Sequence, residues 1–242
     1  MESREPTIRD FLPFCRGERE LTIEEIGTLL KKLGVHNVDF YIGKLQDNSG
    51  NRPVYEDFLV EGEAAATLAV YDFIVSMADR PDLKIEFAGT SFCADAKHFR
   101  WKDKDQVDED KMWEESKKER LAKIGGVVEG RKQPWEQILE VAYRKAEQYS
   151  GSEPFIIIIR SSSPHNIRAK QVEIARNEID KRVSSGWDQV FRKLNGFLFF
   201  DRDFCQSLNR DAYFYPTRII NMSLNSRTLE ALNSIRLYRR IF

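Results

Sequence analysis

Two short runs of alternating apolar residues, joined by four small or polar ones, most constrain the fold of this chain. Apolar and polar residues alternate over 83–87 and again over 92–96, and Ala-Gly-Thr-Ser lies between them at 88–91. Such alternation is typical of strands that bury one face, and the short connection favours a turn. The sequence therefore predicts a β-hairpin over residues 81–98.

The predicted hairpin carries two carboxylates and a lysine. Side chains alternate between the two faces of a strand, so Asp95 and Lys97 project together while His98 faces away. Asp82 lies thirteen positions before Asp95, on the partner strand. Two structural alternatives stay open: an exposed ion pair between Asp95 and Lys97, which adds little to stability, and a turn role for Asp82.

Periodic patterns outside the hairpin predict further helices and strands, and hence an α/β fold. Apolar residues at helical spacing predict helices over 22–33, 57–78, 134–149, 169–184 and 229–242. Runs of strand-forming residues predict strands over 38–42, 155–159, 196–200 and 213–222. We divide the chain into an N-terminal extension, 1–56, and one domain, 57–242, which contains a charged insertion at 100–124.

The charge balance bounds the kinds of partner. The 242 residues include 38 Lys and Arg against 39 Asp and Glu, for a formal net charge of -1. A strongly basic nucleic-acid binder is therefore excluded, and any nucleic-acid surface must be a local patch. The mixed charges of the insertion are typical of a solvated helix or a mobile flap. The insertion or the C-terminal third can also serve a protein partner or a homo-oligomer.

Cysteine usage and hydropathy bear on the compartment. Cys15, Cys93 and Cys205 are odd in number and widely spaced, which favours reduced thiols. The N-terminus has no apolar segment behind a basic stretch, and no run approaches the ~18 apolar residues of a membrane span. We expect a cytoplasmic or nuclear protein that is not secreted and has no membrane partner.

Carboxylates and a lysine in this arrangement fit metal-assisted phosphodiester hydrolysis. Mg²⁺ prefers hard oxygen ligands and keeps several waters, so one or two carboxylates and a backbone carbonyl suffice to hold it. Asp82 and Asp95 can supply the carboxylates and Ala96 the carbonyl. Lys97 can orient or deprotonate the attacking water. The predicted cofactor is therefore Mg²⁺ or Mn²⁺.

Pro81-Asp82, twelve further residues, and then Asp95-Ala96-Lys97 resemble the motif of the PD-(D/E)XK nuclease superfamily. The resemblance covers roughly residues 57–160. It implies a restriction-endonuclease-like fold, a mixed sheet flanked by helices. The core of that fold runs helix, strands, helix and strand, with the motif on adjacent strands. It also implies catalytic roles for the two aspartates and the lysine of the motif.

The resemblance further implies a glutamate from the helix before the strands. Glu63 is the auxiliary metal ligand we expect, although Glu61 has a nearly equal claim and both can simply complement a helix N-terminus. The family usually has three strands between its two helices, whereas the hairpin supplies two. A third strand over 127–131 would make Asp95 the first ligand and Glu129 the second.

In that second frame Arg131 or Lys132 would replace the lysine of the motif. Arginine cannot act as a base, and Lys132 would point to the opposite face, so we rank this frame below the first.

The resemblance implies a metal-dependent nuclease, and we expect a DNA endonuclease rather than an enzyme acting on RNA. Four residues after the predicted buried strand are candidate phosphate contacts: Arg160, His165, Arg168 and Lys170. The alternative, from a different class, is a binding or assembly module that keeps the fold without catalysis.

Overall fold

The computed structural model describes residues 21–99, 133–161, 167–200, 212–217 and 224–235. Its helices are α1 (Ile23–Lys32), α2 (Val38–Asp47), α3 (Arg52–Val70), α5 (Pro134–Gln148), α6 (Ala169–Ser184) and α7 (Ser226–Ser234), with a 3₁₀ turn η3 (Val190–Lys193). Its strands are β1 (Ile74–Met77), β2 (Leu83–Phe87), β3 (Thr90–Phe99), β4 (Phe155–Ser161), β5 (Leu194–Phe200) and β6 (Ala212–Pro216).

The six strands form one mixed sheet in the order β1-β2-β3-β4-β5-β6. β1, β2 and β3 are antiparallel neighbours, whereas β3, β4 and β5 run parallel. β6 returns antiparallel to β5. The sheet therefore changes from antiparallel to parallel pairing at β3, the strand that carries Asp95 and Lys97.

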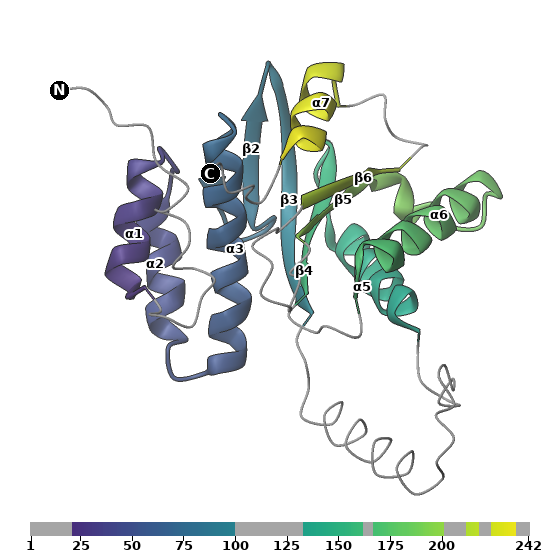
Figure 1. The fold of residues 1–242 in the computed structure, drawn as a ribbon. Helices are drawn as coiled ribbons and strands as arrows, with labels where there is room; N and C mark the ends of the chain where they lie inside the picture. The colour runs from purple at the N-terminus through teal and green to yellow at the C-terminus, as the bar shows by residue number, and fades with distance from the viewer. Residues whose placement is uncertain (1–20, 100–132, 162–166, 201–211, 218–223, 236–242) are drawn as a thin grey trace, which may run out of the picture.

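Helices cover both faces of the sheet (Figure 1). On one face, α1, α2, α3 and α7 pack on a core that includes Ile156 and Ile158 of β4. On the other face, α5 and α6 pack on a core that includes Ile157 and Ile159 of the same strand. A strand buried on both faces is what its continuous apolar run predicts. The predicted α/β sheet flanked by helices is confirmed.

Capping groups fix both ends of α1. The Thr22 hydroxyl accepts from the N–H of Glu25 at 3.2 Å, and Oε2 of Glu25 accepts from the N–H of Thr22 at 2.8 Å, which completes a capping box. After the helix, Gly34 adopts a left-handed backbone with φ of 76°, and the N–H of Val35 donates to the carbonyl of Leu30. The predicted N-terminal helix is confirmed.

The strand predicted over 38–42 is wrong, because these residues open helix α2. Val38 and Tyr41 are both buried and lie three positions apart, as one face of a helix requires. The Tyr41 hydroxyl donates to the carbonyl of Phe58 in α3 at 2.9 Å. Packing against α3 therefore overrides the strand propensity of this valine- and aromatic-rich segment.

The helix predicted over 57–78 is wrong in its last part. α3 ends at Val70, where Asp72 takes a left-handed backbone with φ of 62°. The N–H of Phe73 then donates to the carbonyl of Leu68 at 3.2 Å, which is the closing bond of a Schellman motif. The chain leaves the helix at this point and enters β1.

β1 supplies a third strand between α3 and α5. It pairs with β2 so that Val75 faces Ile85 and Met77 faces Leu83. The segment 127–131 and the rival ligand set built on Glu129, Arg131 and Lys132 lie outside the described residues. The ligand set built on Asp82 and Asp95 therefore has three strands, β1 to β3, without the segment 127–131.

The remaining predicted elements are present with shifted ends. β2 and β3 form the predicted hairpin, and the predicted helices and strands after it correspond to α5, β4, α6 and β5. β6 covers the first part of the strand predicted over 213–222, and α7 begins before the predicted tail helix. Residues 218–223 and 236–242 lie outside the description, as does the insertion 100–124.

The N-terminal helices share the core of the sheet. Ile26 and Leu30 of α1 and Leu45 of α2 are buried in the same cluster as the apolar residues of α3 and β2. Among the described residues, no helix combines the length and the apolar character needed to cross a membrane.

Candidate functional site

The start of β2 brings Asp82 beside Asp95 of β3. The two strands pair so that Leu83 faces Ala94. Asp82 precedes Leu83 and Asp95 follows Ala94, so the two aspartates lie next to each other. The N–H of Asp82 donates to Oδ1 of Asp95 at 3.0 Å, and Oδ2 of Asp82 accepts from the N–H of Ala96 at 2.9 Å. The hairpin itself therefore holds the two carboxylates together.

Both carboxylates are buried, with 9% of each residue exposed. The alternative of an exposed ion pair between Asp95 and Lys97 needs a solvent-facing Asp95, whereas this residue is buried. Its Oδ2 lies 3.0 Å from Nζ of Lys145, which reaches it from α5 on one face of the sheet. A buried carboxylate is stable only with hydrogen bonds or a cation, and Asp95 has both.

Glu61 of α3 is the third carboxylate of this cluster. Its Oε2 lies 2.8 Å from Nζ of Lys44 of α2, and both side chains are buried. Burial, followed by the charge of Asp82, raises the pKa of Glu61 to about 8, although Lys44 opposes the shift. Glu61 therefore belongs electrostatically to the pair on the hairpin.

Asp82 responds to the same crowding. Burial, followed by the charge of Asp95, raises the pKa of Asp82 to about 6, although Lys145 and the N–H of Ala96 oppose the shift. Burial alone would lower the pKa of Lys145, but Asp82 and Asp95 raise it above its ordinary value, so this lysine stays protonated. The two ammonium groups beside the cluster therefore do not keep Glu61, whose pKa is about 8, fully ionised at neutral pH.

The lysine of the motif, Lys97, pairs with a residue of α3 and not with Asp82 or Asp95. Its Nζ lies 3.9 Å from Oδ2 of Asp57 of α3, and a third of its side chain is exposed. The other oxygen of Asp57 lies 3.9 Å from Nδ1 of His98. His98 is buried. The ammonium of Lys97 thus lies beside the N-terminal part of α3.

Glu63 faces away from the hairpin pair. Its Oε2 lies 2.6 Å from Nη1 of Arg160 of β4, and both side chains are largely buried. Two residues along a helix correspond to a rotation of about 200°, so Glu61 and Glu63 cannot face the same way. The structure brings Glu61 to the hairpin carboxylates and assigns Glu63 to an ion pair with Arg160.

The candidate phosphate contacts divide into three groups. Arg160 is buried in its pair with Glu63, so its guanidinium does not face solvent. Arg168 and Lys170 are exposed at the start of α6. His165 lies outside the described residues.

The donor set of the cluster suits a hard cation. Asp82, Asp95 and Glu61 offer carboxylate oxygens, and Ala96 adds a carbonyl, because the N–H and C=O of one strand residue point to the same side. In their described positions, however, no three His, Cys, Asp or Glu side chains converge tightly enough to share one metal ion. A divalent cation would nevertheless supply positive charge that opposes the raised pKa values of Glu61 and Asp82.

Sequence reasoning missed Lys145 and Lys44. Lys145 lies fifty positions after Asp95, and no spacing in the sequence connects the two. The only available signal was the phase of α5: Ile138, Ala142 and Ala146 mark its buried face, and Lys145 lies beside the last of them. A charged residue bordering the apolar stripe of a helix is a candidate for a buried partner.

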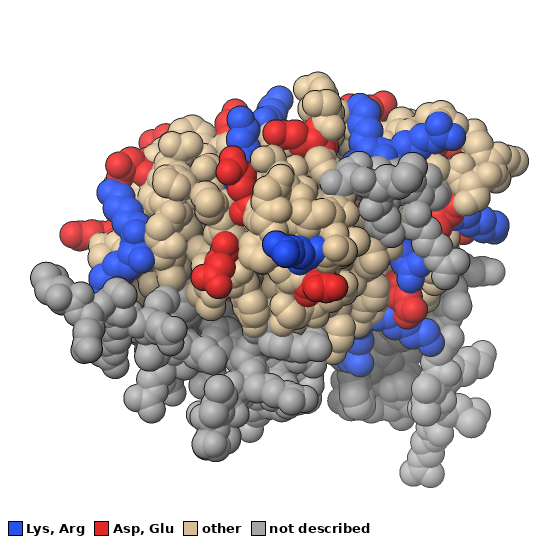
Figure 2. Space-filling model, turned by 90° about the horizontal axis from the view of Figure 1, so that it is seen from above, with Lys and Arg blue, Asp and Glu red and all other residues tan. Residues whose placement is uncertain are grey.

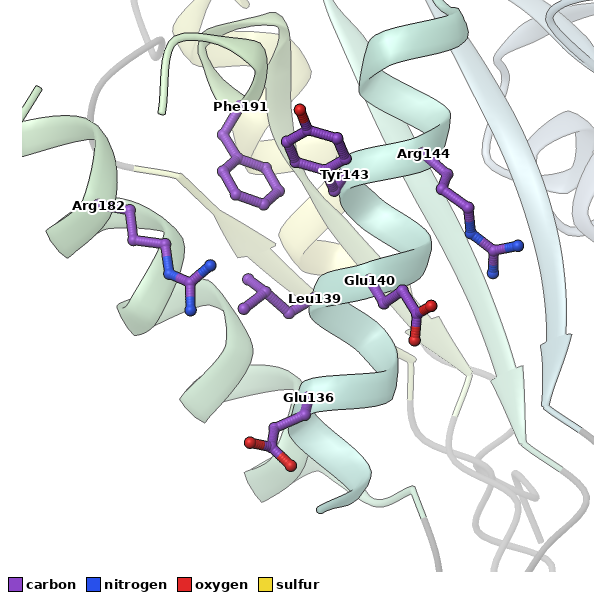
Figure 3. Close-up of a pocket in the computed structure, with 7 residues that line it drawn as sticks. All are labelled: Glu136, Leu139, Glu140, Tyr143, Arg144, Arg182 and Phe191. Atoms are coloured by element: carbon purple, nitrogen blue, oxygen red, sulfur yellow. The ribbon is translucent and has the colours of Figure 1, made fainter. Parts of the chain in front are cut away.

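A separate hollow of about 460 Å³ lies between α5, α6 and η3 (Figure 3). Tyr143 and Phe191 meet edge to face at its wall, with ring centroids 5.7 Å apart. Charged side chains of both signs border it: Glu136, Glu140, Arg144 and Arg182. The hollow shares no lining residue with the carboxylate cluster.

The end of the molecule that carries α7 shows no preference for one sign of charge among its described residues (Figure 2). Lys and Arg are interspersed there with Asp and Glu. α7 lies at the turn between β2 and β3, where Asn225 donates to the carbonyl of Ala88 at 3.1 Å. β3 leads from this end to Asp95, so the carboxylate cluster lies elsewhere on the molecule.

No family model, curated protein or solved structure matches the chain.

Proposed function

We propose that this protein is a metal-dependent nuclease of restriction-endonuclease-like fold that hydrolyses DNA. The observation that carries the proposal is the contact between Asp82 and Asp95, which lie buried side by side and whose carboxylates accept hydrogen bonds from backbone N–H groups of the hairpin. Two carboxylates held together away from solvent create a site that favours a cation, because their mutual repulsion disfavours ionisation without one.

The order of elements supports the fold. α3, the three strands β1 to β3, α5 and β4 follow one another in the sequence that the resemblance implies. β1 fills the place of the strand that the hairpin alone left open. The first motif segment immediately precedes β2 and the second lies within the adjacent strand β3, close to the arrangement that the resemblance implies.

Asp82, Asp95 and the carbonyl of Ala96 are the groups that would hold a Mg²⁺ or Mn²⁺ ion. Glu61 is favoured over Glu63 as the auxiliary acid, because it interacts with Asp82 whereas Glu63 pairs with Arg160. A bound divalent ion would neutralise charge on the scissile phosphate and activate water.

Lys97 is the chain's own candidate for guiding that water. It lies two residues along β3 from Asp95, and Asp57 of α3 lies beside its ammonium. A lysine held by one carboxylate at the edge of a site can hold or pass a proton and stabilise developing negative charge. Arg168 and Lys170, exposed at the start of α6, remain candidate phosphate contacts.

One observation favours the second candidate function, a binding or assembly module without catalysis. Lys145 already supplies a positive charge to Asp95, at 3.0 Å. A protein in which this ion pair permanently replaces a metal would retain the fold and lose metal-dependent hydrolysis.

The two candidates separate in a cleavage assay on single- and double-stranded DNA and RNA with Mg²⁺ or Mn²⁺. We expect wild-type protein to cleave DNA, and Asp95→Ala and Lys97→Ala to lose that activity. Thermal unfolding with and without Mn²⁺ gives the second readout, since an ion that binds only the folded chain must raise its Tm. Equal activity in all three proteins, or no shift of the wild-type Tm with Mn²⁺, contradicts the nuclease.

A further inference from the structure

Helix α5 presents one lysine to the carboxylate cluster. Nζ of Lys145 lies 3.0 Å from Oδ2 of Asp95, with 27% of the lysine side chain and 12% of the aspartate side chain exposed. Lys145 is thus the more exposed of the two partners in this ion pair. A metal ion or a substrate arriving from solvent would meet this ion pair.

The two oxygens of Asp95 have partners of different rigidity. Oδ1 accepts from the N–H of Asp82, which the pairing of β2 with β3 holds in place. Oδ2 is held by the ammonium of Lys145, at the end of a flexible four-carbon chain. Oδ2 is therefore the oxygen that can change its partner while the strands stay paired.

The other lysines near the cluster are held differently. The Lys44 ammonium pairs with Glu61 at 2.8 Å and lies 4.5 Å from the centre of the Phe58 ring, with 16% of its side chain exposed. The Lys97 ammonium lies beside Asp57. Of these three lysines, Lys145 is the one that pairs with a carboxylate of the hairpin, that of Asp95.

We propose that Lys145 is an internal cation that competes with the divalent ion for Oδ2 of Asp95, and that its released ammonium then binds a phosphate of the nucleic acid. This inference rests on the proposed function. A divalent ion carries twice the charge of an ammonium and binds several oxygens at once, so it can replace the ion pair. The displaced lysine stays tethered beside the site, where a phosphate is its natural partner.

Titration of the full-length protein with Mn²⁺ by calorimetry tests the competition. We expect Lys145→Met to bind Mn²⁺ about tenfold more tightly than wild type, because the competing cation is gone. Lys145→Gln should show the same gain, since it keeps a hydrogen-bond donor without the charge. Lys145→Arg should bind as wild type does. Arg144→Met is the matched control, because it removes a charge from the next, exposed position of α5.

Cleavage of DNA at saturating Mn²⁺ tests the phosphate contact. We expect Lys145→Met and Lys145→Gln to turn over about tenfold more slowly despite their tighter metal binding, and Lys145→Arg to recover part of the rate. A purely structural lysine would not raise metal affinity when it is removed. Unchanged or weaker Mn²⁺ binding in both neutral variants overturns the competition, and unchanged turnover overturns the phosphate contact.

The outcome is distinguishable from failure of the proposed function. If wild-type protein and all Lys145 variants bind Mn²⁺ and none cleaves nucleic acid, the nuclease is wrong and the phosphate contact falls with it. The competition still stands in that case if the neutral variants bind the ion more tightly. If neither wild type nor the neutral variants bind Mn²⁺, both proposals are overturned.

Discussion

Two hydrogen bonds from backbone N–H groups to side-chain carboxylates hold Asp82 beside Asp95. The N–H of Asp82 donates to Asp95 at 3.0 Å, and Asp82 accepts from the N–H beyond Asp95, that of Ala96, at 2.9 Å. Strand pairing thus enforces a contact between like charges that the side chains alone would avoid. The hairpin holds the two carboxylates in position, and the positive charge that compensates them comes from outside the hairpin, from Lys145.

Replacing Asp95 with asparagine separates the charge from the architecture. The amide oxygen can still accept from the N–H of Asp82, and relief of the repulsion between Asp95 and Asp82 offsets loss of the ion pair with Lys145, so we expect a Tm close to that of wild type in metal-free buffer. We expect nuclease activity to fall by about a hundredfold or more, and the Mn²⁺-dependent rise in Tm to disappear. Cleavage assays and thermal unfolding with and without Mn²⁺ measure both effects.

Glu86→Gln is the matched control for Asp95→Asn. Glu86 is exposed on the neighbouring strand β2, so its replacement removes a carboxylate from the same hairpin without touching the cluster. We expect metal response and activity to stay at wild-type levels. If Asp95→Asn behaved like this control, Asp95 would have no part in metal binding.

The raised pKa values of two carboxyl groups predict that metal-free protein loses stability as pH rises. Asp82 has a pKa of about 6 instead of 3.8, and Glu61 of about 8 instead of 4.5. A carboxyl group with a raised folded pKa contributes stability below its unfolded pKa and loses that contribution as pH rises through the folded value. We expect the cluster's contribution to decline between about pH 4 and pH 8.

Urea unfolding in EDTA at several pH values measures this decline. Glu61→Gln removes one of the two groups, so it should flatten the pH dependence above pH 6, where Glu61 is the group still titrating. Binding of Mn²⁺ near pH 7 should release protons, because the ion favours the carboxylate form. Calorimetry in buffers of different ionisation enthalpy detects that release, and its absence would show that Glu61 lies outside the metal's influence.

Local patterns in the sequence were enough to predict the hairpin pair, because the register of a short hairpin depends on residues close together in the chain. Alternation over β2 and β3 placed Asp82 and Asp95 on neighbouring strands. β1 was hidden for a related reason: Phe73 and Met77 continue the apolar spacing of α3, and Asp72 takes the left-handed position where glycine is the usual signal.

The partners of the pair could not be read from the sequence. Whether Glu61 or Glu63 faces the hairpin depends on how α3 is rotated against the sheet, and both positions lie among buried residues. The contact of Lys145 with Asp95 depends on how α5 packs on the opposite face. Such contacts arise from tertiary packing, for which spacing along one element carries no information.

The ion pair between Glu63 and Arg160 should stabilise the fold rather than the site. Their side chains are 13% and 9% exposed, with 2.6 Å between Oε2 and Nη1. Glu63→Gln leaves the guanidinium without this carboxylate in a buried position, so we expect a loss of roughly 3 kcal/mol in the free energy of unfolding. Urea denaturation measures it.

The exposed pair of Arg52 and Glu56 on the same helix provides the comparison for that measurement. Its side chains are 78% and 31% exposed, so Glu56→Gln should change the free energy of unfolding by less than about 0.5 kcal/mol. Mn²⁺ binding should survive in Glu63→Gln if Glu61 is the auxiliary acid. Loss of Mn²⁺ binding at wild-type stability would instead restore Glu63 as a ligand.

Gly62 lies between the two glutamates and lets α2 approach α3. A Cβ at this position would overlap the hydroxyl of Tyr41, whose ring is fully buried and whose hydroxyl donates to the carbonyl of Phe58. Gly62→Ala must therefore push Tyr41 away or rotate α3. We expect a loss of about 1–3 kcal/mol in the free energy of unfolding, and weaker Mn²⁺ binding because Glu61 moves with its helix.

Gly43→Ala in α2 isolates the effect of that overlap. Gly43 is also helical, but no atom lies within 4 Å of the Cβ it would gain. Alanine should therefore stabilise α2 by about 0.5–1 kcal/mol through its lower backbone entropy in the unfolded chain, with Mn²⁺ binding unchanged. Urea unfolding and Mn²⁺ titration of both variants measure the contrast. Equal stability changes in the two would show that Tyr41 does not set the distance between α2 and α3.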